Sequence, residues 1–183
     1  MSNEVDVEEL YLQYYRDIYQ FALYFSNNKQ DAEDITQETF IKAMKNIHSL
    51  RDTKRAKYWL LSISKHTAID HLRKKKLKNL LPGILEKLSK QDETESLDDQ
   101  LLLKEKWAEI QLVLLKIKPH YRSLLILRGI QELSVKEAAE VLQCTELKVR
   151  VDFHRAVKLL KKELHLLEGG NSGEKDRTTA SRS

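Results

Sequence analysis

The chain has 183 residues, of which 41% are hydrophobic and 33% charged, and its net charge is +4 at neutral pH. Glycine (five) and proline (two) are scarce, and the long periodic stretches lack the alternation of half-buried strands, which predicts an all-α protein with one modest core or two small ones. The single cysteine excludes an internal disulfide and a multi-cysteine zinc cluster, and without an apolar run of membrane length or a secretory start we expect a cytoplasmic protein.

The charges are segregated along the chain. Residues 1–50 carry four basic and nine acidic side chains, whereas residues 51–80 carry ten basic and two acidic ones. Such blocks indicate different partner surfaces rather than a particular fold.

Three amphipathic helices are predicted in a first small domain, residues 1–79: one over 11–25, one over 31–47 and one over 58–78. Asp31 is expected to cap the second helix. The apolar spacing of that helix leaves three polar residues on its outer side, together with Ile41: Asp34, Gln37 and Glu38. An exposed ridge of this kind is usually a solvated face, but it could also dock on a basic partner surface.

The third helix and the charge-rich loop before it, residues 48–57, form a candidate nucleic-acid surface. Lys65, His66 and Arg73 line the side of the helix opposite its apolar arc, with Trp59 at the boundary between the two sides. Cationic groups follow phosphates, and bases stack on planar side chains. The alternative is a solubilising basic end of a helix, which also complements the helix dipole.

An acidic segment, residues 80–100, begins around a Pro-Gly pair and is predicted to be a flexible linker. A second helical domain follows, residues 101–168. Its first helix should end before Pro119, and its second leads into a helix-turn-helix. The tail, residues 169–183, has no apolar periodicity and is predicted to be disordered.

The helix-turn-helix is the most informative segment of the chain. Ser134 and Glu137 have the spacing of a capping box at the start of its first helix, and Thr145 can cap the second helix. Gln143 stands in the turn between the two helices, and a left-handed conformation there would cost a residue other than glycine about 1 kcal/mol.

The second helix of this motif has one apolar and one cationic side. Its predicted inward residues are Val149, Phe153, Ala156 and Leu160. Its predicted outward residues are Lys148, Arg150, Val151, His154, Arg155 and Lys158. A cationic outer face suits a helix in a DNA major groove, although a solvated lysine-rich helix is the alternative. Asp152 is expected near the DNA backbone, where its charge would oppose phosphate binding.

Three stretches taken together resemble the extracytoplasmic-function (ECF) group of bacterial RNA polymerase sigma factors. They are DAEDITQETFIKAMKNI, KYWLLSISKHTAIDHLRKKK and IKPHYRSLLILRGIQELSVKEAAEVLQCTELKVRVDFHRAVKLLKK. The resemblance covers about residues 11–164. It implies a first domain that binds polymerase and reads the −10 promoter element, and a second domain that reads the −35 element.

The resemblance also assigns roles to individual residues. Asp34, Gln37 and Glu38 would face the clamp helices of the largest subunit of core RNA polymerase. The −10 element would be contacted by His48, Ser49, Arg51, Lys54, Arg55, Lys65, His66 and Arg73, with the loop receiving a flipped base. The −35 element would be read by Lys148, Arg150, Val151, His154, Arg155 and Lys158, of which Lys148 and Lys158 would touch phosphates. An anti-sigma factor is a further implied partner, and no cofactor is expected.

Two alternatives compete with this interpretation. His66 and Asp70 lie four residues apart on one helix, with His71 adjacent, a spacing that could bind a metal in an enzyme, but no third ligand is evident. No phosphate loop or nucleophile elbow accompanies them, so no metal site and no enzymatic activity are predicted. The nearer alternative is a two-domain DNA-binding regulator that acts without polymerase.

Overall fold

The computed structural model of the chain describes residues 7–80 and 101–172, with side chains described for residues 7–78 and 107–166. These residues form helices joined by short turns, and no strand occurs among them. The predicted all-α class is therefore confirmed for the part of the chain that the structure describes. The predicted linker lies outside it, apart from Leu80, which ends a helix.

The first domain is a bundle of three helices, α1 (Val7–Ser26), α2 (Lys29–Lys45) and α3 (Ala56–Leu80), with two short 3-10 turns between α2 and α3 (Ile47–Ser49 and Thr53–Arg55). All three lie where the sequence predicted them. Their apolar sides meet in a core that includes the fully buried Ile18, Phe21, Phe25, Ile35, Leu60 and Leu61.

The predicted cap of α2 is wrong by three residues. Asn28 is the N-cap, and its Oδ1 accepts a hydrogen bond from the backbone N of Asp31 at 2.9 Å. The carboxylate of Asp31 instead binds α3, with Oδ1 3.1 Å from His71 Nε2 and Oδ2 2.5 Å from Lys75 Nζ. Both residues suit a cap, and the carboxylate of Asp31 is engaged with His71 and Lys75 of α3 instead.

The second domain consists of α4 (Leu101–Lys116), α5 (Pro119–Leu125), a π-helical turn (Ile126–Ile130), α6 (Val135–Leu142) and α7 (Glu146–Ser172). Pro119 stands in the first turn of α5, where its missing N–H removes no helical hydrogen bond. A small core joins α4, α5 and α7 through Val113, Leu114, Ile117, Leu125 and Ala156. Helix α7 continues to Ser172, past residue 168 at which we expected the domain to end.

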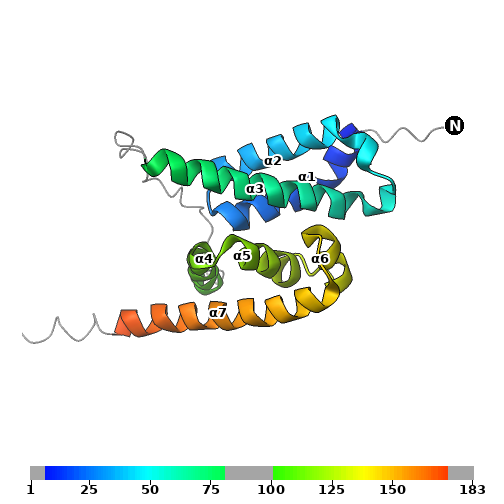
Figure 1. The fold of residues 1–183 in the computed structure, drawn as a ribbon. Coiled ribbons are helices and arrows are strands. Elements are labelled where there is room, and N and C mark those ends of the chain that lie inside the picture. Colours follow the sequence, from blue (N-terminus) through cyan, green and yellow to red (C-terminus); the bar gives the residue numbers. More distant parts are fainter. Residues whose placement is uncertain (1–6, 81–100, 173–183) are drawn as a thin grey trace, which may run out of the picture.

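The two domains pack against each other in two layers, with the α1–α3 bundle on one side and α4–α7 on the other (Figure 1). Helix α6 lies on α3, and α4 and the π-helical turn lie on α1. Buried residues of both layers, including Phe21, Leu60, Leu127 and Val141, belong to one continuous apolar cluster. Nothing in the sequence indicates this packing, since the sequence pattern predicts two separate units joined by a linker.

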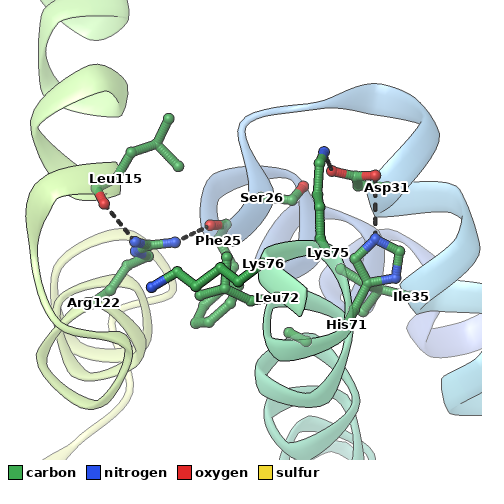
Figure 2. Close-up of a pocket in the computed structure, with 11 residues that line it drawn as sticks. Phe25, Ser26, Asp31, Ile35, His71, Leu72, Lys75, Lys76, Leu115 and Arg122 are labelled. Atoms are coloured by element: carbon green, nitrogen blue, oxygen red, sulfur yellow. Dashed lines mark hydrogen bonds and ion pairs between the residues drawn. The ribbon is translucent and has the colours of Figure 1, made fainter. Parts of the chain in front are cut away.

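Arg122 of α5 connects the two layers. Its Nη1 donates to the carbonyl oxygen of Phe25 at the end of α1 (2.8 Å), and its Nη2 donates to those of Leu115 (2.7 Å) and Ile117 (3.2 Å) at the end of α4 (Figure 2). The guanidinium also lies 5.0 Å from the centre of the Phe25 ring. Burial lowers the pKa of Arg122 to about 10, so the side chain remains a cation at neutral pH.

A cavity of about 240 Å³ lies beside Arg122, where α1, α2 and α3 meet α4 and α5 (Figure 2). Phe25, Ile35, Leu72 and Leu115 supply apolar lining from both domains. The Asp31–His71–Lys75 cluster forms its polar wall. Because both domains contribute to its lining, the cavity depends on the packed arrangement.

We predict that Arg122→Met destabilises the protein by about 2–4 kcal/mol. Arg122 is only 3% exposed, and removal of its guanidinium leaves three carbonyl oxygens without their hydrogen-bond donor. Urea unfolding followed by circular dichroism measures the change. Arg16→Met removes the same group from an exposed position of α1 and should cost no more than about 0.5 kcal/mol. Equal stability of the two variants would show that Arg122 does not hold the layers together.

Candidate nucleic-acid interface

The helix-turn-helix is built by local hydrogen bonds that the sequence predicted. The backbone N of Ser134 donates to Glu137 Oε2 (2.6 Å), and the backbone N of Glu137 donates to Ser134 Oγ (3.3 Å), which completes the capping box of α6. Thr145 Oγ1 accepts from the backbone N of Lys148 at 3.2 Å and caps α7. Gln143 ends α6 in the left-handed conformation, with φ of 54°, as expected for this turn position.

The orientation of α7 agrees with its predicted sides. Val149 and Ala156 are buried, and Phe153 and Leu160 are partly buried, all toward the rest of the domain. The six predicted outward residues are exposed: Lys148, Arg150, Val151, His154, Arg155 and Lys158. Helix α7 lies on the side of its domain away from the α1–α3 bundle (Figure 1). The cationic face of α7 is therefore open in the packed arrangement.

Asp152 departs from the prediction, because it does not lie at the exposed face. It is only 4% exposed, and its Oδ2 lies 3.0 Å from His120 Nε2 of α5 and 2.7 Å from Lys148 Nζ. Arg155 Nη1 approaches the other carboxylate oxygen at 3.8 Å. The hydrogen bond from Lys148 is the main reason why the pKa of Asp152 lies below its ordinary value. The acid is an anchor between α7 and α5 rather than a repulsive charge toward DNA.

The second basic surface comprises the two 3-10 turns and the outer side of α3. Seven of its eight predicted residues are exposed: His48, Ser49, Arg51, Lys54, Arg55, His66 and Arg73. Trp59, which is partly buried, joins the loop to α3, because its Nε1 donates to Ser49 Oγ at 3.1 Å. The sequence predicts this indole at the boundary between the apolar and basic sides of α3, and its contact with Ser49 adds it to the basic surface.

Lys65 was predicted to be outward and exposed, but the structure buries it to 8% exposure. Cys144, in the turn between α6 and α7, lies close enough to interact with its amine, and α6 packs on α3. Desolvation lowers the pKa of Lys65. The spacing of residues along α3 carries no information about this packing.

Three polar contacts join α6 to this surface. Glu140 Oε2 lies 3.3 Å from Arg55 Nη2, Tyr58 Oη donates to Glu137 Oε1, and Gln143 Nε2 donates to Ser62 Oγ at 3.3 Å. The bond to the Glu137 carboxylate is the main reason why the pKa of Tyr58 is raised to about 12. Sequence reasoning missed Tyr58 and Ser62, because nothing local indicates a contact between segments about eighty residues apart.

The acidic ridge on α2 remains open. Asp34 and Gln37 are exposed, and Glu38 is partly exposed, with its Oε1 2.9 Å from Lys42 Nζ. This hydrogen bond to Lys42 is the main reason why the pKa of Glu38 is lowered. Ile41 and Met44, one turn further along α2, add exposed apolar surface next to the ridge.

The metal alternative gains no support from the described side chains. His66 Nδ1 lies 2.8 Å from the carbonyl oxygen of Ser62, and His71 binds Asp31, so the two histidines have separate partners. Among the described residues no group of three potential metal ligands occurs. None of the helices in that part of the chain is long and apolar enough to cross a membrane.

The fold and its basic surfaces define a two-domain DNA-binding protein of the helix-turn-helix class. Comparison with family models identifies both domains: the model for Sigma-70 region 2 matches residues 10–78, and the model for Sigma-70, region 4 matches residues 107–160.

Related proteins agree over nearly the whole chain. The ECF RNA polymerase sigma factor SigX of Bacillus subtilis is 34% identical over 166 residues, covering 86% of this chain and 83% of SigX. The RNA polymerase sigma factor YlaC of the same organism is 33% identical over 165 residues, covering 90% and 95%. The chain therefore belongs to the ECF RNA polymerase sigma factors.

Solved structures share the fold. The sigma factor RpoE of Bartonella quintana, in complex with the anti-sigma factor NepR, aligns with a TM-score of 0.65 and 22% identity, covering 86% of this chain and 96% of RpoE. CnrH, in complex with the cytosolic domain of CnrY, aligns with a TM-score of 0.62 and 20% identity, covering 87% and 88%. With the family established, the protein is a transcription initiation factor, not an enzyme, and it directs RNA polymerase to specific promoters.

The anchoring role of Asp152 gives a prediction opposite to the one that the sequence alone suggests. Asp152→Arg should destabilise the protein by about 3 kcal/mol or more, because it would bury a cation beside His120, Lys148 and Arg155. Asp152→Asn, which keeps the size, should cost about 1 kcal/mol. Thermal unfolding measures both changes. An Asp152→Arg variant that is as stable as the wild type and binds DNA more tightly would show that residue 152 faces the DNA phosphates.

The pH dependence of the stability of Asp152→Asn supplies a control for this prediction. Because the pKa of Asp152 is lowered in the folded state, its contribution is present above the ordinary aspartate pKa of about 4 and is lost as the pH falls below it. Asp152→Asn should therefore be least different from the wild type in acid.

Proposed function

We propose that this sigma factor contacts its promoter through two surfaces, the outer side of α7 for the −35 element and the outer side of α3 with its preceding loop for the −10 element. The observation that carries the proposal is the orientation of α7. Its apolar residues are buried against α5 and α6, so the rotation of the helix leaves one cationic side outward.

Within the −35 surface, Arg150 has the side chain best suited to read a base. Its guanidinium is exposed and pairs with Glu146, with Nη2 3.3 Å from Oε2, a surface pair that costs little to break. A released guanidinium can make two parallel hydrogen bonds to a guanine edge. Lys158, about two turns further along, would follow phosphate.

Within the −10 surface, the loop and Trp59 would hold a base extruded from the stack. The Trp59–Ser49 hydrogen bond fixes the indole against the loop, while Arg51 and Lys54 offer exposed cations for the backbone of the strand. His66 and Arg73 would continue this contact along α3.

The ridge of Asp34, Gln37 and Glu38 would dock on the clamp helices of the largest polymerase subunit. Its open position, with Ile41 and Met44 beside it, provides the mixture of charge and apolar area that a protein interface needs. We further propose a cytoplasmic site of action, where polymerase and promoters meet, and an anti-sigma factor as a partner, as for RpoE in its solved complex with NepR.

Run-off transcription with core polymerase on a library of randomised promoters tests the proposed function as a whole. We expect enrichment of templates that share a −35 and a −10 element. The same library, used with polymerase lacking this protein, provides the background. Binding to duplex DNA without polymerase-dependent transcription would favour the alternative regulator.

The double variant Asp34→Lys/Glu38→Lys should lose binding to core polymerase while keeping its helical content, because both side chains lie on the surface of α2. A pull-down of core enzyme measures binding, and circular dichroism measures helicity. The matched control, Glu9→Lys/Glu109→Lys, makes the same charge change at exposed positions of α1 and α4 and should bind normally. Undiminished capture of polymerase by the ridge variant would remove the ridge from the interface.

Two substitutions on α7 should change DNA binding in different ways. Arg150→Ala should cost about 1–3 kcal/mol on the preferred promoter and relax preference at one base position, since a contact with a base edge is lost. Lys158→Ala should weaken binding to all sequences alike and reduce the salt slope by about one. Binding across a randomised −35 element distinguishes the two, and an unaltered base profile for Arg150→Ala would mean that another residue reads the groove.

A further inference from the structure

The cavity between the two domains has apolar walls and an excess of cations (Figure 2). Its apolar lining comes from α1, α2, α3 and α4, and three cations also line it: Lys75, Lys76 and Arg122. Among the described residues that line the cavity, Asp31 supplies the single carboxylate. Apolar walls with a few convergent polar groups are typical of sites for small ligands, and the excess of cations favours an anion.

Only part of this cationic charge is compensated. Lys75 Nζ lies 2.5 Å from one oxygen of Asp31, and the other oxygen lies 3.1 Å from His71 Nε2. Lys76 forms no ion pair with the described residues, and its side chain extends from α3 toward Arg122 (Figure 2). The amine of Lys76 is therefore available to a ligand anion.

Arg122 contributes a second donor. Its Nη1 and Nη2 donate to backbone carbonyl oxygens, but its Nε has no hydrogen-bond partner among the described residues. The side chain is only 3% exposed, and a buried N–H without an acceptor costs free energy in the folded state. Because Arg122 forms part of the lining, an oxygen atom bound in the cavity would satisfy this donor.

The volume of the cavity sets the size of its ligand. At about 240 Å³ it lies just below the range of about 300–1,000 Å³ that is usual for drug-sized ligands. One water molecule, with a share of about 30 Å³ in the liquid, would fill only a small part of this space. A short alkyl chain would contact the apolar walls, and its removal from water is favourable.

The charge of the ligand's headgroup follows from the surroundings of the two donors. Asp31 lies on the same lining, and its carboxylate would repel the second negative charge of a phosphate monoester. A carboxylate carries a single charge and has two oxygens, which can accept from the Lys76 amine and from Arg122 Nε–H simultaneously. These groups therefore favour a carboxylate headgroup.

We propose that this cavity binds a small amphipathic carboxylate of the medium-chain fatty-acid class, with its headgroup at Lys76 and Arg122 and its alkyl chain along the apolar walls. The site shares no residue with the surfaces assigned to DNA and polymerase, so it is independent of the proposed function. Because residues of both domains line the cavity, a bound carboxylate would contact both domains, and the folded chain should become more stable as the ligand concentration rises.

Isothermal titration calorimetry of the full-length protein with sodium octanoate, at submicellar concentrations, measures the binding. We expect saturable binding of one octanoate. Octanamide, which keeps the chain and lacks the charge, should bind about tenfold more weakly, because charge-assisted hydrogen bonds are lost. Sodium acetate, which lacks the chain, should not bind measurably. Octyl phosphate should bind more weakly than octanoate.

Two variants with matched controls test the two parts of the site. Lys76→Met should weaken octanoate binding about tenfold without weakening octanamide binding, whereas Lys78→Met, at an exposed position outside the cavity, should change neither. Leu115→Trp should weaken both ligands at least about tenfold, because the larger side chain fills the cavity. Leu112→Trp, at an exposed position of α4 outside the lining, should leave both affinities unchanged.

Methyl NMR spectra locate the bound ligand. Octanoate should shift the methyl signals of Ile35, Leu72 and Leu115, which line the cavity, and leave those of Leu159 on α7 in place. Saturable binding with these shifts and with the predicted loss in Lys76→Met supports the proposal. Binding that does not saturate, equal losses in the two lysine variants, or shifts confined to other methyl groups would overturn the site. Tighter binding of octyl phosphate than of octanoate would overturn the carboxylate assignment.

Discussion

The packed arrangement of this protein depends on one buried cation that receives the ends of two helices. Carbonyl groups in the last turn of a helix lack intrahelical donors and carry partial negative charge. Arg122 satisfies such groups at the end of α1 and at the end of α4 simultaneously, and its planar fork reaches both in a way that a lysine ammonium would not. The guanidinium thereby stabilises its own domain and fastens that domain to the α1–α3 bundle.

The packing of the two domains leaves the two basic surfaces of the molecule with different exposure to solvent. Helix α7 faces away from the bundle and keeps its cations exposed, whereas α3 faces α6 and has Lys65 buried. Exposed cations attract DNA at long range, whereas burial desolvates the amine of Lys65.

Two acidic residues serve as internal ties in this structure. Asp152 holds α7 to His120 of α5, and Asp31 holds α2 to His71 and Lys75 of α3. Each carboxylate is paired and hydrogen-bonded, as burial requires. An acid in a basic helix is thus no argument against DNA binding when its side chain turns inward.

The sequence by itself determined the helices, the capping box of α6, the left-handed turn at Gln143 and the outward side of α7, because these features depend on residues within a few positions of one another. It placed six of the α7 residues and the α2 ridge correctly at the surface. Only the tertiary structure decided that Lys65 is covered, that Asp152 points inward and that Asn28 rather than Asp31 caps α2. Each of these depends on contacts between segments far apart in the chain, and neither periodicity nor charge pattern carries information about which faces of two domains meet.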